Sequence, residues 1–331
     1  MSFHKHTLKD IAKALNLSTS TVSRALRDSY EISDKTKKKV IQYARKINFQ
    51  VNPIARNLKE RKSNTIGVVV SEISNNFFSQ VIEGIESVAY EKNYQVVITQ
   101  SHESAVREKR IVEHLFNRSV DGLLMTLTAS EKEAYYLKEL VTSGFPIVFF
   151  DRVPEGYMTK KVIANNVQGA VDAVNFLVKN NCRRIVHLTG AKHLSTNKDR
   201  LEGFKQGLEL NGLDYKSNDI KYCESAGTDL DEVMALIKEL KDYDGIFISG
   251  DRLTTGYLQV INRFSDYKTH KIIGFTNSKV VDIFNPPITA IRQPAIEMGA
   301  CAAKLLIAQI ESKYPVEEFE TITLPVELID I

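Results

Sequence analysis

Four polar side chains lie close together between Thr19 and Arg24, and their types could contact the edges of nucleic-acid bases. Thr19, Ser20 and Ser23 carry hydroxyl groups that donate and accept hydrogen bonds without bulk. Arg24 carries a planar guanidinium, which can pair with guanine through two hydrogen bonds. An ordinary solvated helix face could carry the same residues, so the surrounding elements must decide between the two interpretations.

The surrounding sequence predicts three short helices. Thr7, Ser18 and Ser33 are the expected N-caps, and Asp10 favours the positive end of the first helix. The second helix is predicted over Thr19–Leu26, after a turn at Asn16-Leu17, which makes a helix-turn-helix. Apolar residues at helical spacing predict one buried face per helix: Ile11, Ala12 and Leu15, then Val22, Ala25 and Leu26, then Val40, Ile41, Ala44 and Ile47.

The charge of this segment favours the nucleic-acid interpretation. Residues 1–62 contain 15 Lys and Arg against 5 Asp and Glu, whereas the whole chain contains 44 against 41. A basic head therefore precedes an acidic body. The regular spacing of apolar residues in the head indicates a folded module, and its positive charge indicates a polyanionic partner. A disordered basic tail is the alternative, but it would not need the apolar periodicity.

The head resembles the DNA-binding region of the lactose/purine repressor family (LacI–GalR). The residues that carry the resemblance are Thr7-Leu8-Lys9-Asp10-Ile11-Ala12, Leu17-Ser18, Thr21-Val22-Ser23-Arg24, Ser33, Lys35-Thr36, Asn52-Pro53, Ala55-Arg56 and Leu58-Lys59. It implies that Thr19, Ser20 and Arg24 read bases of double-stranded, pseudo-palindromic operator DNA, and that Ser23, Ser33 and Thr36 hold phosphates.

The connector after the head contains a short predicted helix from Ile54 to Leu58, opened by Pro53 and too short to be stable alone. In the family, the corresponding hinge helix folds on specific DNA and wedges a leucine into the minor groove. The resemblance implies that Leu58 is this wedge and that Ala55 and Lys59 flank it. The alternative is a flexible linker in which Leu58 packs against the body.

From Thr65 onward, short apolar runs alternate with helical patterns, which indicates parallel strands covered on both faces. The stretch that begins at Phe77 after the first strand resembles the stretch that begins at Asp199, and this weak echo favours two similar lobes. The predicted strands are Ile66–Val70, Gln95–Thr99, Gly122–Met125, Ile147–Phe150, Val162–Ala164, Arg184–Leu188, Ile220–Cys223, Gly245–Ser249, Lys271–Phe275, Thr289–Arg292 and Thr321–Leu328.

The fold class expected for the chain is therefore an all-α helix-turn-helix domain with a hinge helix, followed by an α/β body of two doubly wound parallel-sheet lobes. The resemblance implies a periplasmic-binding-protein-like body with three crossovers between the lobes. The expected limits are 1–50 for the DNA-binding domain, 51–64 for the hinge and linker, 65–162 plus 293–322 for the first lobe, and 163–292 plus 323–331 for the second.

Sequence motifs give no support to an enzyme. Neither G-x-G-x-x-G, nor G-x-x-x-x-G-K-[ST], nor G-x-S-x-G is present. The three cysteines and seven histidines have no metal-ligand spacing, and His187 lies in an apolar run, as a core or cleft-rim histidine with satisfied hydrogen bonds would. We therefore expect no catalytic residue, no metal and no cofactor.

Polar and aromatic residues at strand ends are the candidates for a small-molecule site, because ligands bind such sheets at the carboxyl ends of their strands. In the family, these positions commonly contact the effector, and Arg200 matches an arginine that clamps a hydroxyl or a carboxylate. Each could also be a polar loop or capping residue, Asp251 above all. The candidates are Asn76, Phe77, Phe78, Asp151, Arg152, Thr196, Arg200, Asp251, Thr276 and Gln293.

The ligand expected from the resemblance is a sugar or a sugar derivative. Gly250 and Thr276 replace residues that bind hydroxyls in sugar-responsive members, and Leu194 replaces an arginine of purine-responsive ones. Arg152 and Arg200 suit an acidic ligand such as a uronate, although they could instead pair with Asp151 or Glu202. The resemblance is compatible with a ligand that releases DNA and with one that promotes binding.

Three further expectations concern the setting of the protein. No apolar run approaches the ~20 residues of a membrane span and no signal-peptide pattern opens the chain, so a cytoplasmic, nucleoid-associated protein is predicted. Paired half-sites predict a homodimer, with the first-lobe surface and the helix near Ile296 to Gln309 as contributors. The rival function is a small-molecule (sugar) binding protein without a regulatory DNA role.

Overall fold

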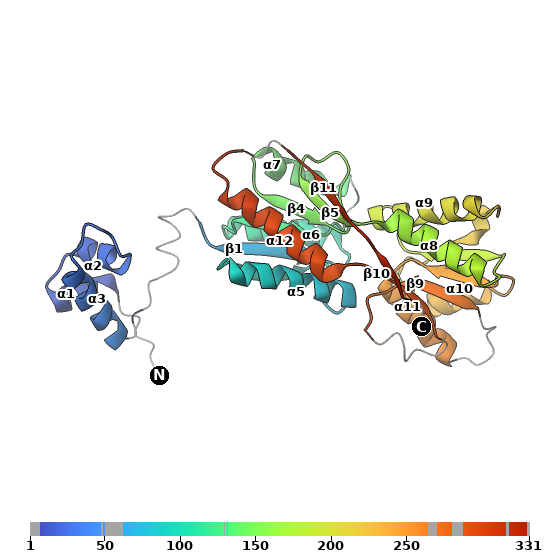
Figure 1. The fold of residues 1–331 in the computed structure, drawn as a ribbon, viewed down its shortest axis with the longest axis horizontal. Coiled ribbons are helices and arrows are strands. Elements are labelled where there is room, and N and C mark those ends of the chain that lie inside the picture. The colour runs from blue at the N-terminus through green and yellow to red at the C-terminus, as the bar shows by residue number, and fades with distance from the viewer. Residues whose placement is uncertain are drawn as a thin grey trace. The chain divides into compact units, whose positions relative to one another are not determined.

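The computed structural model describes residues 7–47, 49, 62–128, 130, 132–263, 270–279, 287–315 and 318–329. The chain forms two compact units, a head within Met1–Ser63 and a body within Asn64–Ile331, and each is described by itself (Figure 1).

The head contains helices α1 (Leu8–Leu15), α2 (Thr19–Leu26) and α3 (Asp34–Lys46). Thr7 and Asp10 form a reciprocal capping box on α1, and the side chains of Ser18 and Ser33 cap α2 and α3 as predicted. The three helices bury one apolar cluster, but Ile41 is 36% exposed, contrary to expectation, because it lies beside the face of α3 that carries the buried residues. The buried cluster consists of Ile11, Ala12, Val22, Ala25, Val40 and Ala44.

The first lobe is built on a parallel sheet in the order β11-β5-β4-β3-β1-β2. Alternate residues of its strands face opposite sides, and both sides are covered by helices. Helices α5 (Asn76–Glu91) and α12 (Ala295–Glu311) pack on one face, and α6 (Ala105–Asn117), α7 (Leu137–Thr142) and the 3₁₀ turn η1 (Glu133–Tyr136) on the other. The strands are β1 (Thr65–Val70), β2 (Gln95–Gln100), β3 (Gly122–Met125), β4 (Ile147–Phe150), β5 (Lys160–Ala164) and β11 (Thr321–Leu324).

The second lobe repeats this design with the order β12-β10-β9-β8-β6-β7, in which β12 is antiparallel to β10. Helices α8 (Asn166–Lys179) and α9 (Ser195–Leu210) cover one face, and α10 (Leu230–Lys238) and α11 (Asp251–Arg263) cover the other. The 3₁₀ turn η2 (Ser217–Asp219) precedes the edge strand. The strands are β6 (Ile185–Thr189), β7 (Ile220–Tyr222), β8 (Gly245–Ile248), β9 (Lys271–Phe275), β10 (Thr289–Arg292) and β12 (Glu327–Ile329).

Three short connections join the lobes, after β5, after β10 and after β11. The single last strand predicted over Thr321–Leu328 was wrong, because β11 belongs to the first sheet and β12 to the second. Pro325 lies between them and has no backbone N–H for a sheet hydrogen bond, so the strand ends there. The expected lobe limits at 163 and 323 fall inside β5 and β11, and both crossings come slightly later.

The weak sequence echo between the lobes has a structural cause. Gly84 in α5 and Gly203 in α9 each lie where a second helix crosses closely, since a Cβ on Gly84 would lie 2.0 Å from the carbonyl oxygen of Ile296 in α12. A Cβ on Gly203 would lie 2.2 Å from the carbonyl oxygen of Val167 in α8. The same small residue therefore allows the same helix pairing in both lobes.

Candidate functional site

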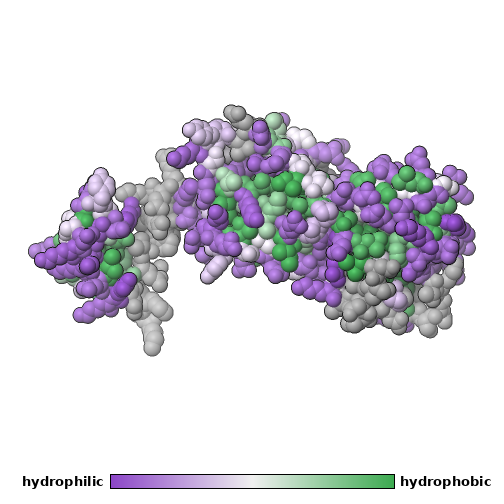
Figure 2. All heavy atoms as spheres, in the orientation of Figure 1, coloured by the Kyte–Doolittle hydropathy of each residue, from purple (hydrophilic) through white to green (hydrophobic). Residues whose placement is uncertain are grey.

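The candidate DNA-contacting residues of the head lie on and around α2. Thr19, Ser20 and Arg24 are exposed, and Ser23 is half-buried. The hydroxyl of Ser20 hydrogen-bonds that of Ser18 at 2.7 Å, and Arg24 Nη1 forms an ion pair with Glu31 Oε2 at 2.8 Å. Figure 2 shows that hydrophilic side chains cover most of the visible face of the head.

Ser33 and Thr36 hold each other at the start of α3, with 3.0 Å between their hydroxyl oxygens, and the backbone N–H of Thr36 donates to Ser33 Oγ. Both hydroxyls thus lie at a helix N-terminus, where backbone amides favour a phosphate. The remaining three DNA candidates, Ala55, Leu58 and Lys59, and the predicted hinge helix lie outside the described residues.

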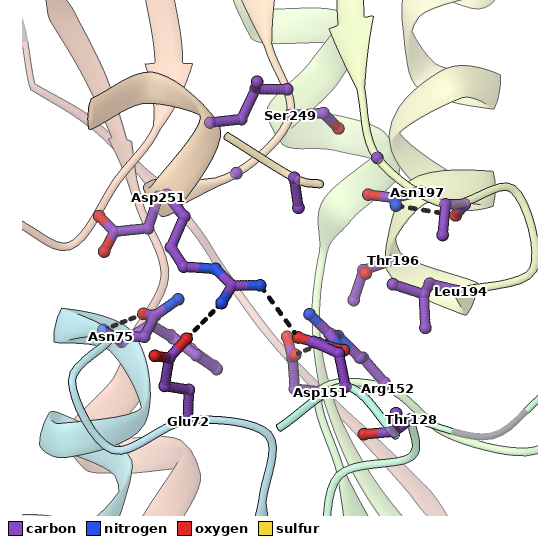
Figure 3. Close-up of a pocket in the computed structure, with 18 of the residues that line it drawn as sticks. Glu72, Asn75, Thr128, Asp151, Arg152, Leu194, Thr196, Asn197, Ser249 and Asp251 are labelled. Atoms are coloured by element: carbon purple, nitrogen blue, oxygen red, sulfur yellow. Dashed lines mark hydrogen bonds and ion pairs between the residues drawn. The ribbon is translucent and has the colours of Figure 1, made fainter. Parts of the chain in front are cut away.

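A cavity of about 530 Å³ lies between the two lobes of the body, at the carboxyl ends of strands from both sheets. Both lobes line it, and five carboxylates and three arginines are among the lining side chains. Eight of the ten residues predicted for a small-molecule site line this cavity: Phe77, Phe78, Asp151, Arg152, Thr196, Arg200, Asp251 and Gln293. Asp151, Arg152, Thr196 and Asp251 are labelled in Figure 3.

The other two candidates lie beside the cavity rather than in its wall. Asn76 is exposed at the start of α5, and its amide nitrogen lies 3.4 Å from Asp251 Oδ2. The neighbouring residue Asn75 lines the cavity instead. Thr276 is buried and donates its hydroxyl hydrogen bond to Asp251 Oδ1. Neither side chain therefore lines the cavity, because each hydrogen-bonds to Asp251, and the prediction that both contact an effector stays a prediction.

Asp151 is placed by an unusual backbone at the end of β4, with a φ of 60°. Its side chain is buried, and Gln293 Nε2 donates a hydrogen bond to Asp151 Oδ1 at 3.1 Å. Burial raises the pKa of Asp151 above its ordinary value, although Arg152 and Arg200 oppose the shift. Because Gln293 lies between β10 and α12, this hydrogen bond ties the cavity wall to one of the lobe connections.

Arg200 lies in the second turn of α9, which begins at Ser195, so Thr196 and Arg200 both belong to the helix. The guanidinium donates to Asn166 Oδ1 at 2.8 Å and to the carbonyl oxygen of Ser249 at 3.3 Å, and it lies 3.7 Å from the centre of the Phe275 ring. Burial lowers the pKa of Arg200 to about 10. Among the described residues no carboxylate lies within ion-pair distance of it, so neither Asp151 nor Glu202 pairs with it.

The sequence prediction missed three charged residues that line one rim of the cavity, Glu72, Glu103 and Arg252. Arg152 Nη1 lies 2.7 Å from Glu103 Oε2, and Arg252, the second residue of α11, pairs with both Glu72 and Glu103. In Figure 3, a dashed line marks the ion pair that Glu72 forms. Glu72 follows β1 and Arg252 follows β8, which are strand-end positions like those that did identify candidates.

The opposite rim is also bridged between the lobes. Lys198 of α9 forms an ion pair with Glu155 at 3.3 Å, the backbone N–H of Val153 donates to Ser195 Oγ at 3.1 Å, and His193 Nε2 lies 3.1 Å from the carbonyl oxygen of Thr128. The cavity is thus enclosed by contacts on two sides.

His187 does not belong to this cavity. It is fully buried in the second lobe between the rings of Phe204 and Phe247, and neither ring nitrogen has a hydrogen-bond partner among the described residues, so the expectation of a satisfied histidine was wrong. The described residues contain no cluster of His, Cys, Asp or Glu that could hold a metal ion. No helix among them combines the length and apolar character of a membrane span.

Known proteins resemble both units. Residues 7–52 match the family described as "Bacterial regulatory proteins, lacI family", and residues 66–314 match "Periplasmic binding protein domain". The chain is 31% identical over 323 residues to "Probable HTH-type transcriptional regulator EndR" of Paenibacillus polymyxa, covering 93% of this chain and 91% of that protein.

The "Ribose operon repressor" of Bacillus subtilis (strain 168) is also 31% identical, over 331 residues, covering 98% of this chain and 97% of that protein. The solved structure of the lac repressor dimer bound to operator and the anti-inducer ONPF is 22% identical, and it superposes with a TM-score of 0.84 over 98% of both chains. At that identity, the likeness to the lac repressor concerns the fold.

Proposed function

The chain belongs to the LacI family of bacterial transcriptional regulators, as a DNA-binding repressor, and we propose that a sugar bound between its two lobes controls its affinity for a specific operator. The observation that carries this proposal is the combination, in one chain, of a helix-turn-helix head with a body whose enclosed cavity is lined from both lobes. The family is one of regulators rather than enzymes.

On the DNA side, α2 enters the major groove. Thr19, Ser20 and Arg24 read base edges, whereas Ser23, Ser33 and Thr36 hold phosphates. The exposure of Thr19, Ser20 and Arg24 supports this assignment. Arg24 must exchange its ion pair with Glu31 for a base or a phosphate, a small loss because both side chains are about half exposed (58% and 43%).

The hinge contributes the minor-groove contacts. We assign Leu58 to the wedge between base steps and Ala55 and Lys59 to the flanking contacts, on the sequence pattern alone. The wedge acts at the centre of a pseudo-palindrome, which requires one hinge from each of two chains.

On the effector side, the charge of the cavity favours a neutral polyhydroxylated ligand. Five carboxylates against three arginines line it, and two of the three arginines are paired with carboxylates of the protein itself. Carboxylates and amides such as Asp151 and Asn197 bind sugar hydroxyls, and Phe77 and Phe78 in the cavity lining offer apolar contact. A sugar acid is the second candidate, because Arg200 is buried and no carboxylate in the described part of the chain pairs with it.

A homodimer fits the sheet edge of the first lobe. β2 is an edge strand, and its neighbouring residues Val97 and Ile98 are each 40% exposed. α12 is a weaker candidate than the sequence indicated, because it packs against α5 and the sheet, although Ile296 is 45% exposed. A cytoplasmic, nucleoid-associated location follows from the DNA-binding role, and the head's match to the LacI family favours that role over a sugar-binding protein without it.

The test is selection of binding sites from random duplex DNA with the purified full-length protein near physiological salt. We expect a short inverted repeat with a fixed centre, and we expect its recovery to change when a mixture of sugars is added. Recovery of no motif, with or without the sugars, would mean that the head binds DNA as a polyanion and would overturn the proposal.

A further inference from the structure

Four charged side chains form a continuous network at the α11 rim of the cavity, which we call the rim network: Glu72, Arg252, Glu103 and Arg152. Arg252 is the second residue of α11 in the second lobe, and both of its carboxylate partners belong to the first lobe. Arg252 Nη2 lies 3.4 Å from Glu103 Oε1, and Arg152 Nη1 lies 2.7 Å from Glu103 Oε2. The charges therefore alternate in sign along the network, and Arg252 carries it across the gap between the lobes.

The network is shielded enough for its charges to interact strongly. The side chains of Glu72, Arg252 and Glu103 are 27%, 23% and 31% exposed, whereas Lys198 and Glu155 on the opposite rim are 48% and 71% exposed. Burial acts to raise the pKa of Glu103, but Arg152 and Arg252 hold it below its ordinary value, so the carboxylate stays charged. Exposed pairs such as Lys198–Glu155 contribute little by comparison.

Two neutral hydrogen bonds between Gln80 and Asn277 also join the lobes. The side-chain amide of Gln80 in α5 donates to the carbonyl oxygen of Asn277 at 2.9 Å, and the Asn277 amide donates to Gln80 Oε1 at 3.1 Å. The lobes are linked covalently by three short segments, an arrangement that permits hinge motion. An ion pair that joins the two lobes at the cavity rim therefore stabilises their closed arrangement.

We propose that Arg252 is an interlobe clasp: its pairing with Glu72 and Glu103 holds the cleft closed in the absence of any ligand. The bridging groups all come from this chain, so closure does not depend on an effector to supply them. The clasp thus sets the ratio of closed to open molecules in the ligand-free protein. An effector that binds one of the two arrangements more tightly shifts this ratio. This inference rests on the proposed function only in assigning the cavity to the effector.

The experiment measures lobe separation in ligand-free, DNA-free protein. Spin labels are attached to cysteines introduced at Glu113 in α6 and Glu209 in α9, which are both exposed, in a full-length chain that carries Cys301→Ser. Dipolar spectroscopy, with labelled chains diluted by unlabelled protein, gives the distance distribution within one chain. We expect one narrow population in the parent protein.

Removing the clasp should open the cleft. In Arg252→Met we expect the ratio of closed to open molecules to fall by about tenfold or more, the scale of a hydrogen bond to a charged group. The double variant Glu72→Gln with Glu103→Gln should give the same shift while leaving Arg252 in place. In the parent protein, about 1 M salt should shift the distribution the same way, because the Debye length falls to about 3 Å.

Two controls separate the clasp from a general loss of charge. Arg263→Met removes an exposed arginine from the same helix, and Lys198→Met removes the interlobe pair at the opposite rim; neither should shift the distribution. Unchanged distances in Arg252→Met and in the double glutamine variant, with normal thermal unfolding, would overturn the clasp. That outcome would leave the proposed repressor function intact, because the measurement uses neither operator nor sugar.

Discussion

Single side chains at strand ends were the most predictable part of the cavity. Asp151 follows β4 and Asp251 follows β8, and the rule that ligands bind at the carboxyl ends of parallel strands located both from the sequence. Asn76 and Thr276 obey the same rule yet turn away, because hydrogen bonds to Asp251 hold them outside the wall. Glu72 and Arg252 also follow strand ends, but 180 residues separate them in the chain, so the sequence did not reveal that they pair.

His187 gives a prediction about acid stability. Burial, with a smaller contribution from Arg200, lowers its pKa from 6.5 to about 3, so the folded protein keeps the ring neutral while the unfolded chain binds a proton below about pH 6.5. The free energy of unfolding therefore falls as the pH drops from about 6.5 toward 3, at about 1.4 kcal/mol per pH unit for this group.

The variant His187→Phe should remove that dependence. Phenylalanine retains the contacts with Phe204 and Phe247 and eliminates two buried nitrogens that no described residue hydrogen-bonds, so we also expect about 1–3 kcal/mol of added stability near pH 7. Urea unfolding between pH 4 and 7 measures both effects, with His114→Phe on the exposed face of α6 as the control. If the free energy of unfolding fell with pH equally in the parent and in His187→Phe, the pH dependence could not come from His187.

At the scale of elements, the alternation of apolar runs and helical patterns predicted the strands of both sheets, because strands covered on both faces must be apolar throughout. Strand partners are a different matter. The segment after α12 reads as one strand, but Leu324 ends β11 in the first sheet and Glu327 begins β12 in the second. Hydrophobic pattern identifies a strand, and tertiary packing decides which sheet receives it.

The sequence similarity between the lobes was attributed to glycines that allow two helices to cross closely, and substitution of Gly84 tests this explanation. Gly84→Ala would improve the intrinsic helix propensity of α5 by about 1 kcal/mol, yet its Cβ would meet the Ile296 carbonyl, so we expect a net loss of about 1–3 kcal/mol. Thermal unfolding measures the difference, and Ser87→Ala on the exposed side of α5 is the control. A stabilised Gly84→Ala protein would show that the crossing tolerates a methyl group.

At the scale of the whole molecule, the apolar edge of the first sheet predicts how two chains associate. Val97→Glu places a charge on the exposed edge strand β2, where a partner chain would have to bury it. We therefore expect the dissociation constant of the proposed dimer to rise by at least about tenfold. Sedimentation equilibrium measures this, with Leu210→Glu, 72% exposed in the second lobe, as the control. A Val97→Glu protein that dimerises as tightly as its parent would exclude this edge.

The three crossings between the lobes also dictate an order of events on the ribosome. β11 and α12, which complete the sheet and the helical cover of the first lobe, follow the bulk of the second lobe in the chain. The emerging first lobe must therefore wait, with the face that α12 will cover exposed, until residues beyond the second lobe have been translated. The head, a separate compact unit of local contacts, can fold while most of the body is still unmade. A chaperone that shields nascent chains would accordingly find its binding site on the first lobe.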